Sequence, residues 1–207
     1  DLVQWEAFPE KILSPADATV LRARRWATPL TRAQFQIVTG AADFPDHLRA
    51  DLRDGVLQAF SNGEFTYRLR GIHARVSVTW NFEAPPGQGD SHYSVMRDTK
   101  ANLVIRQGAA QQFKPVLYIE RATEAAANAA VAALQAKYPG VGLRREGEAW
   151  AVTVHASYDV GHEAHFAQVM ENFLHYLRDG RLPAWEVPNM ITKYSTLMQA
   201  YTLSRRP

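Results

Sequence analysis

Hydrophobic and polar side chains alternate without interruption over residues 72–83. A period of two residues is typical of a β-strand that buries one face and leaves the other polar. We therefore predict one long strand, in an antiparallel or mixed sheet that is covered on one side. The apolar positions are Ile72, Ala74, Val76, Val78, Trp80 and Phe82, and the polar positions are His73, Arg75, Ser77, Thr79, Asn81 and Glu83.

The residues just before this strand repeat the alternation. Phe65, Tyr67 and Leu69 share one parity, with polar or charged residues between them. The dipeptide Asn62-Gly63 lies between two such runs, and this pair tolerates the positive φ angles of a tight turn better than others. The pattern predicts a β-hairpin over residues 56–71 that turns at Asn62-Gly63.

Shorter patterns place the remaining elements before the C-terminal helices. Thr31 is suited to cap a short helix over residues 32–38, and Gly40 is suited to end it. Residues 123–140 are rich in alanine and predict a helix that stops at a Pro-Gly pair. Strands are expected at residues 18–26, 101–107, 114–120 and 149–156, a helical turn at 44–55, and a loop at 84–91.

Two long helices are predicted near the end of the chain. Each has apolar residues at spacings of three and four, so we expect each stripe to be the face that packs. The first stripe is Phe166, Val169, Met170, Phe173, Leu174 and Leu177, and the second is Met190, Ile191, Tyr194, Leu197, Met198 and Tyr201.

Together these elements predict an α+β fold. We expect an open-faced, predominantly antiparallel (mixed) β-sheet with helices packed on one face, formed by residues 1–207 as one domain. The chain has 207 residues, enough to bury a sizeable core, and no internal repeat or low-complexity segment interrupts it.

Composition excludes several classes of protein. Lys plus Arg is 23 against 21 Asp plus Glu, a formal net charge of +2, so we expect neither nucleic acid nor an anionic membrane as a partner. There is no cysteine, which excludes disulfides, thiolate metal sites and cysteine nucleophiles. No apolar run is long enough to span a bilayer. We expect a soluble protein, cytoplasmic or periplasmic, with the compartment left open.

The start of the second-last helix has an unusual group of polar residues. Gly161, His162, Glu163 and His165 precede the first apolar stripe. Zinc proteases place two histidines at i and i+4 on one helical face, whereas here the spacing is i and i+3. Three interpretations stay open: a metal site that also uses His155, a corner that faces a ligand, and an ordinary polar helix start with Glu163 near the positive end of the helix dipole.

Two further polar groups are candidates for binding. The polar side of the 72–83 strand is rich in hydrogen-bond donors, which fits either a solvated face or a surface covered by another subunit or domain. A glycine-rich loop before residue 107 carries His92, Arg97 and Lys100. This loop lacks the strand-then-helix context of a phosphate-binding loop, so it is weak support for nucleotide binding.

The first residues have no start signal of their own. Leu2 and Trp5 fall at helical spacing, and Pro9 closes the segment. We interpret residues 1–6 as the last turns of a helix that begins upstream, which would make the chain a fragment of a longer polypeptide.

Several segments resemble one known family. Residues 1–10, 24–40, 54–94, 97–108 and 161–194 are similar to the C-terminal domain of putative oxidoreductases in bacterial members of the Gfo/Idh/MocA superfamily, the glucose–fructose oxidoreductase and inositol dehydrogenase-like enzymes. The most specific run is 80–94, "WNFEAPPGQGDSHYS". One departure is Asp98, where the resemblance leads us to expect glycine.

The resemblance implies a function for a longer parent protein. Its members pair an N-terminal Rossmann domain that binds NAD or NADP with a C-terminal open-faced sheet, and they transfer a hydride to or from a sugar, polyol or derivative. This chain has no glycine fingerprint for the dinucleotide and no Asp-x-x-x-His-x-x-Asp motif. We therefore expect the Rossmann domain, the cofactor and the catalytic histidine to lie outside this chain, which by itself should be inactive and hold neither cofactor nor metal.

The expected contribution of the chain is a substrate pocket and subunit contacts. The partners implied are a small sugar-like substrate, the parent's own Rossmann domain, and further copies in a homo-oligomer formed through the open sheet face. An alternative is a non-catalytic binding or assembly module that uses the same face, and a weaker one is a metal-dependent hydrolase. The residues predicted to bind substrate are His92, His162, His165, Arg97, Lys100, Asn81 and Trp80.

Overall fold

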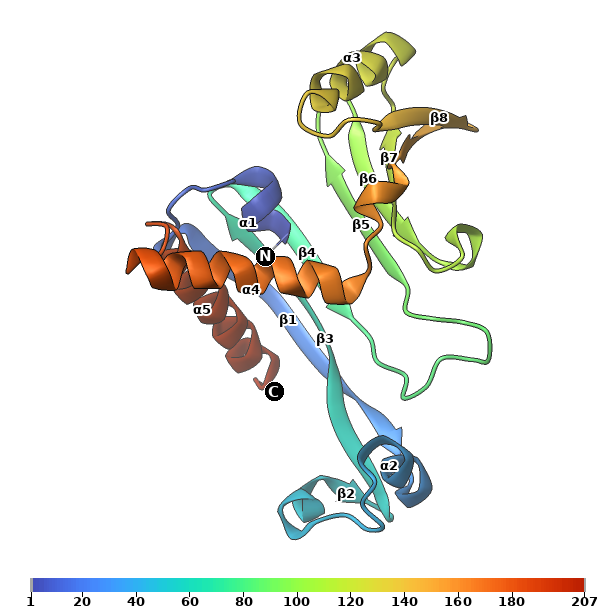
Figure 1. The fold of residues 1–207 in the computed structure, drawn as a ribbon. Coiled ribbons are helices and arrows are strands. Elements are labelled where there is room, and N and C mark those ends of the chain that lie inside the picture. Colours follow the sequence, from blue (N-terminus) through green and yellow to red (C-terminus); the bar gives the residue numbers. More distant parts are fainter. Residues whose placement is uncertain (1, 207) are drawn as a thin grey trace. The chain divides into compact units, whose positions relative to one another are not determined.

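The structure, a computed structural model, describes residues 2–206 and divides into two compact units (Figure 1). Unit 1 comprises residues 2–83 and 176–206, and unit 2 comprises residues 84–175. Each unit contains one antiparallel sheet with at least one helix, which confirms the predicted α+β class. In the part of the chain that is described, no helix is both long enough and apolar enough to cross a membrane.

The sheet of unit 1 is built around one long central strand. Strand β3 pairs antiparallel with β1, β2 and β4. Two two-residue turns connect it to its neighbours in sequence, Asp54-Gly55 and Arg70-Gly71, and all four of these residues have positive φ. Such turns match the twist of a hairpin. The strands are β1 (Ala18–Leu30), β2 (Leu52–Arg53), β3 (Val56–Leu69) and β4 (Ile72–Val78).

The predicted turn at Asn62-Gly63 is wrong. Strand β3 continues through both residues, and Gly63 is not among the residues with positive φ. The Asn62 side chain is only 4% exposed and joins three segments instead. Its Nδ2 donates to the Trp26 carbonyl and to Thr28 Oγ1 at 3.2 and 2.9 Å, and its Oδ1 accepts from the Trp80 backbone N–H at 2.7 Å.

These hydrogen bonds lie where strand pairing is irregular. The register of β1 against β3 shifts between Trp26 and Thr28, next to the partner position of Asn62. A shift of this kind leaves backbone groups without ladder partners, which must then be satisfied by side chains. The Asn62 amide satisfies these groups. Asn62 therefore stabilises a continuous strand and its neighbours, and it does not form a turn.

The strand predicted over residues 72–83 is shorter than expected. Strand β4 ends at Val78, and Phe82 adopts a positive φ of 71°. Trp80 and Phe82 pack at the edge of a core formed by Leu30, Phe35 and Leu57. The alternation therefore predicted the strand correctly as far as Val78, where the chain leaves the sheet to cover this cluster.

Strands β3 and β4 have one apolar and one polar face, as predicted. Residues that are directly paired share a face, and Phe65 pairs with Val76 while Glu64 pairs with Ser77. On the polar face, Glu64 accepts hydrogen bonds from Arg75 at 2.6 Å and from Arg24 at 3.4 Å. The Arg75 guanidinium, and then that of Arg24, lowers the pKa of the Glu64 carboxyl below its usual value.

Helices of unit 1 pack against its apolar face. Tyr67 and Leu69 form a core with Leu13 and Ala18, against which Phe8 packs. The short helix α2 begins at a Thr31 cap and ends at Gly40, as predicted. The helices are α1 (Leu2–Ala7), α2 (Arg32–Thr39) and α5 (Glu186–Ser204), with short 3-10 turns η1 (Pro15–Asp17) and η2 (Asp46–Asp51).

Helix α5 packs on β1 with an unexpected face. Its buried side chains are those of Asn189, Thr192, Thr196 and Ala200. The hydroxyls of Thr192 and Thr196 each donate to a carbonyl four residues earlier at 2.8 Å, so burial leaves them satisfied. Small side chains allow the helix backbone to lie close to the strand. The apolar stripe that we expected to pack is on the opposite side and is 41–59% exposed.

Unit 2 has a five-stranded antiparallel sheet in the order β5-β6-β7-β9-β8. Val104, Tyr118 and Ala151 are central in one buried cluster, and Ile119 and Trp150 pack with helix α3 in another. Strands β6, β7 and β9 and helix α3 were predicted from the sequence, whereas β5 and β8 were not. The elements are β5 (His92–Arg97), β6 (Asn102–Gln107), β7 (Val116–Glu120), α3 (Glu124–Gln135), β8 (Gly142–Glu146) and β9 (Ala149–Thr153), with 3-10 turns η3 (Ala109–Gln111) and η4 (Ala156–Tyr158).

The remaining helix, α4 (His162–Asp179), has no buried side chain. The side chains of its predicted apolar stripe do lie along one side of the helix, but each of them is 48–66% exposed, so the stripe does not pack as expected. The boundary between the units falls within this helix, after residue 175.

Candidate functional site

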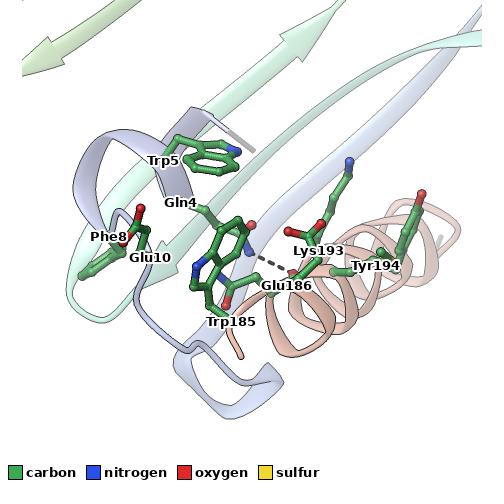
Figure 2. Close-up of a pocket in the computed structure, with 10 residues that line it drawn as sticks. Gln4, Trp5, Phe8, Glu10, Trp185, Glu186, Lys193 and Tyr194 are labelled. Atoms are coloured by element: carbon green, nitrogen blue, oxygen red, sulfur yellow. Dashed lines mark hydrogen bonds between the residues drawn. The ribbon is translucent and has the colours of Figure 1, made fainter. Parts of the chain in front are cut away.

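A hollow of about 170 Å³ lies in unit 1, between α1 and the start of α5 (Figure 2). It combines aromatic, charged and amide side chains, which is the composition of a small-molecule site. The lining residues are Gln4, Trp5, Phe8, Glu10, Trp185, Glu186, Asn189, Met190, Lys193 and Tyr194. We call it the Trp5–Trp185 pocket.

Asn189 fixes the two walls of this pocket relative to each other. It is 8% exposed, and its Oδ1 accepts from the Leu13 backbone N–H at 2.8 Å. Its Nδ2 donates to the Lys11 carbonyl at 2.9 Å, and its own carbonyl accepts from Gln4 Nε2 at 3.2 Å. One residue of α5 thus holds both α1 and the segment that follows it, through hydrogen bonds in buried and partly buried positions.

Two indole rings meet at the pocket. The ring centroids of Trp5 and Trp185 are 5.2 Å apart at an interplanar angle of 81°, an edge-to-face contact. Aromatic pairs favour this geometry because the positive edge of one ring meets the negative face of the other. Trp5 is 55% exposed, so part of its indole surface is open to a ligand.

Charged groups of both signs surround the indoles. Glu10 and Glu186 provide carboxylates, and Lys193 provides an ammonium group that lies 5.5 Å from the ring centroid of Tyr194. Glu10 has a φ of 56°, a left-handed conformation that is uncommon for a residue with a Cβ. Strained backbone is often found at ligand sites, where the surrounding structure maintains it.

This arrangement combines hydrogen-bonding groups with an apolar surface. Carboxylates, amides and ammonium groups can hydrogen-bond to the polar groups of a ligand, and an indole can pack on its apolar face. The pocket offers both kinds of contact to one ligand.

The predicted cluster of His92, Arg97 and Lys100 does not form. All three are exposed in unit 2, and His92 and Arg97 are the first and last residues of strand β5. The five residue-to-residue steps of strand between these two place them about 17 Å apart. Arg97 and Lys100 flank the turn between β5 and β6, whereas His92 is at the other end of the hairpin.

His162 and His165 are both exposed in the first turn of α4. The His162 ring stacks on Phe166 at 6.3 Å between centroids, which occupies one of its faces. His155 forms a hydrogen bond with Ser157 instead: Nδ1 and Oγ are 2.9 Å apart. Among residues 2–206, no three His, Cys, Asp or Glu side chains are placed to hold one metal ion.

The last two predicted residues belong to unit 1. Trp80 is half-buried against the core described above, and its backbone N–H donates to Asn62 Oδ1. The Thr28 hydroxyl donates to the backbone carbonyl of Trp80. Asn81 is exposed beside it. The seven predicted substrate-binding residues therefore lie in several places, and their roles stay a prediction.

The Trp5–Trp185 pocket was not predicted from the sequence. Its two indoles are 180 positions apart. The helical spacing of Leu2 and Trp5 predicts a helix, but it does not indicate what Trp5 meets. The one available signal was Trp185 itself, an aromatic residue between two prolines in a short connector.

Two comparisons with known proteins concern the chain as a whole. The family model described as "Putative oxidoreductase C terminal domain" matches residues 1–205. The solved structure of a putative oxidoreductase from Parabacteroides merdae ATCC 43184 is similar, with 43% sequence identity and a TM-score of 0.94. The match covers 99% of this chain and 48% of that one, so this chain spans about half the length of the solved protein. The comparison with curated proteins found no match.

Proposed function

The chain belongs to the family described as "Putative oxidoreductase C terminal domain", and from this premise we propose that it forms the substrate side of an oxidoreductase that acts on a sugar, polyol or derivative. The Trp5–Trp185 pocket carries the proposal. In it, indole surface and two carboxylates lie together with an amide and an ammonium group. The residues of this chain bind and orient the substrate ring.

The proposed reaction is hydride transfer with NAD or NADP, which the cofactor performs while the protein positions its partner. The described residues do not fit a dinucleotide. Pyrophosphate is normally held by a glycine-rich turn between a parallel strand and a helix, and both sheets here are antiparallel. We therefore assign the cofactor to the portion of the longer relative that this chain does not match, and we derive no chemical step through it.

A test of this proposal uses the full-length protein that contains this chain. We expect NAD- or NADP-dependent turnover with polyols such as inositol or glucose, and none with cyclohexanol, which has the ring without the additional hydroxyls. We expect Trp185→Ala to raise KM by about 10-fold, a loss of about 1.4 kcal/mol, with little change in kcat, because it removes contacts made equally in the ground and transition states.

Two controls make the result specific to the pocket. Trp26→Ala removes an indole that packs under Arg24, away from the pocket, and should leave KM unchanged. The 207-residue chain by itself should show no turnover. Turnover by that chain, or an unchanged KM in the Trp185→Ala enzyme, would contradict the proposal.

The expected oligomer contact through the open sheet face belongs to the same proposal. The polar face of unit 1 supports it in one respect, because Arg24, Glu64 and Arg75 form a charge cluster on it. Exposed ion pairs contribute little to stability by themselves but give specificity to an association.

A further inference from the structure

A second hollow, of about 430 Å³, lies in unit 1, and the residues that line it all differ from those of the Trp5–Trp185 pocket. Its walls come from β1, β3, η2 and the C-terminal end of α5. A hollow of this volume is within the range of small-molecule sites. We call it the Arg25–Arg205 pocket, and its lining residues are Arg25, Leu48, Asp51, Leu57, Gln58, Ala59, Phe60, Tyr201 and Arg205.

Two guanidinium groups of this pocket lie against aromatic rings. The Cζ atom of Arg25 is 4.4 Å from the ring centroid of Phe60 and 5.4 Å from that of Tyr201. The Cζ atom of Arg205 is 5.5 Å from the same Tyr201 centroid. Such contacts use the planar face of a guanidinium and leave its N–H edge for hydrogen bonds. The rings therefore position both arginines at one pocket.

Neither arginine has an acidic partner within the described part of the chain. Arg24, the residue before Arg25, lies on the other side of β1 and pairs with Glu64. Among residues 2–206, no carboxylate oxygen lies within 4.0 Å of a side-chain nitrogen of Arg25 or Arg205. Asp51, the acidic residue in the lining, is exposed. The lining therefore carries a net positive formal charge.

A purely structural role does not use the hydrogen-bonding capacity of Arg25. A guanidinium has five N–H donors. Arg25 is half-buried, and its side chain makes no hydrogen bond to any other residue between 2 and 206. The position opposite it on β3 is Gly63, which has no side chain. Packing against two rings explains the planar face of Arg25 but leaves its donors available to a ligand oxygen.

The chemistry of the pocket indicates the class of ligand. Carboxylate and phosphate oxygens match the N–H fork of arginine, which often binds them through two parallel hydrogen bonds. Leu48, Leu57 and Phe60 line the same pocket, so an apolar portion of a ligand can pack beside the charges. We propose that the Arg25–Arg205 pocket binds a small organic anion, with a carboxylate or phosphate group on an apolar body. This site is separate from the proposed substrate pocket and does not depend on the oxidoreductase function.

Three small probes test the proposal in the full-length protein that contains this chain. Phenyl phosphate and benzoate carry the two anionic groups on the same ring, and benzyl alcohol carries the ring without a charge. In isothermal titration calorimetry we expect saturable binding of at least one anion, with a Kd of about 1 mM or tighter. We expect no binding of benzyl alcohol. The anion that binds more tightly identifies the preferred group.

Variants of three arginines assign the binding to this pocket. Arg205→Gln should weaken binding of the preferred anion by about 10-fold or more, because it removes a charge-assisted hydrogen-bond donor. Arg205 is exposed, so this variant should keep the wild-type thermal midpoint when no probe is present. Arg25→Lys keeps the charge but loses the planar fork, and it should also weaken binding. The matched control is Arg24→Gln, on the other side of β1, which should bind the anion as the wild type does.

Three results would overturn the proposal. The first is that neither anion binds at concentrations up to about 10 mM, as would happen if an acidic side chain from the unmatched half of the longer protein filled the pocket. The second is binding that Arg205→Gln and Arg25→Lys both leave unchanged, which would place the anion elsewhere in the longer protein. The third is an equal loss of affinity in Arg24→Gln, which would show a general effect of positive charge.

Discussion

The Asn62 side chain joins β1, β3 and the segment after β4 through three hydrogen bonds. Replacement by alanine leaves the Trp80 N–H and the Trp26 carbonyl without this partner in a partly buried position. An unsatisfied buried polar group costs about 1–3 kcal/mol. We expect Asn62→Ala to lower the free energy of unfolding by about 3 kcal/mol, measured by urea denaturation.

The control is another amide in an exposed position. Gln88 lies in the loop over residues 84–91, and Gln88→Ala should change stability by less than about 0.5 kcal/mol. If both variants lost the same small amount, the Asn62 network would not contribute to stability.

Asp17 gives the fold a dependence on pH. Hydrogen bonds from Arg70, and then from the Ser14 backbone N–H, lower the pKa of its carboxyl to about 2. Arg70 Nε and Asp17 Oδ1 are 2.9 Å apart. Because the folded pKa is below the unfolded value of about 3.9, this contribution is present above pH 4 and is lost as the pH falls toward 2.

We therefore expect the thermal midpoint of the wild type to fall between pH 4 and pH 2 more steeply than that of Asp17→Asn. Arg70→Gln should flatten the profile in the same way, since it removes the main cause of the shift. Asp90→Asn, which removes an exposed loop carboxylate, should keep the wild-type slope. Equal slopes for Asp17→Asn and the wild type would show that another carboxyl governs this range.

At the scale of elements, two glycines distinguish the predicted hairpin turn from the observed one: Gly63 belongs to the predicted turn, and Gly71 belongs to the observed turn. Gly71 has a φ of +88°, where an added Cβ meets no atom but the backbone conformation is unfavourable. Gly71→Ala should cost about 1–2 kcal/mol. Gly63 lies within a strand, where its added Cβ would be 3.8 Å from the Arg24 carbonyl oxygen, an ordinary contact.

Gly63→Ala should accordingly be neutral or stabilise the protein by up to about 1 kcal/mol, because alanine loses less backbone entropy on folding. Urea denaturation of both variants measures the difference. The opposite order of stabilities would place the turn at Asn62-Gly63 after all.

An element is predicted well from the sequence when the interactions that form it involve only a few neighbouring residues. The Thr31 cap, the Gly40 stop and the alternation in β4 act within a few residues, and all three were read correctly. The face with which α5 packs is not local. Its apolar stripe was visible, but periodicity does not say whether Thr192 and Thr196 or Met190 and Met198 meet the sheet.

At the scale of the whole molecule, the predicted α+β class with antiparallel strands is confirmed, and family membership follows from the match over residues 1–205. The candidate site could not be predicted because it depends on contacts between distant segments. Asn189 at the start of α5 hydrogen-bonds Gln4 in α1 and the residues that follow α1, and these contacts hold Trp5 near Trp185. Hydrogen bonds across more than 170 positions leave no periodic signal in the sequence.

Two residues give the pocket and the exposed apolar side of α5 a common boundary. Met190 and Tyr194 line the Trp5–Trp185 pocket, and they are also 46% and 56% exposed on the side of α5 away from β1. A ligand that favours one side-chain arrangement of Tyr194 would change the affinity of this side of α5 for any protein surface that covers it, and that surface would change ligand affinity by the same factor. Occupancy of the pocket would then depend on which surface lies against α5.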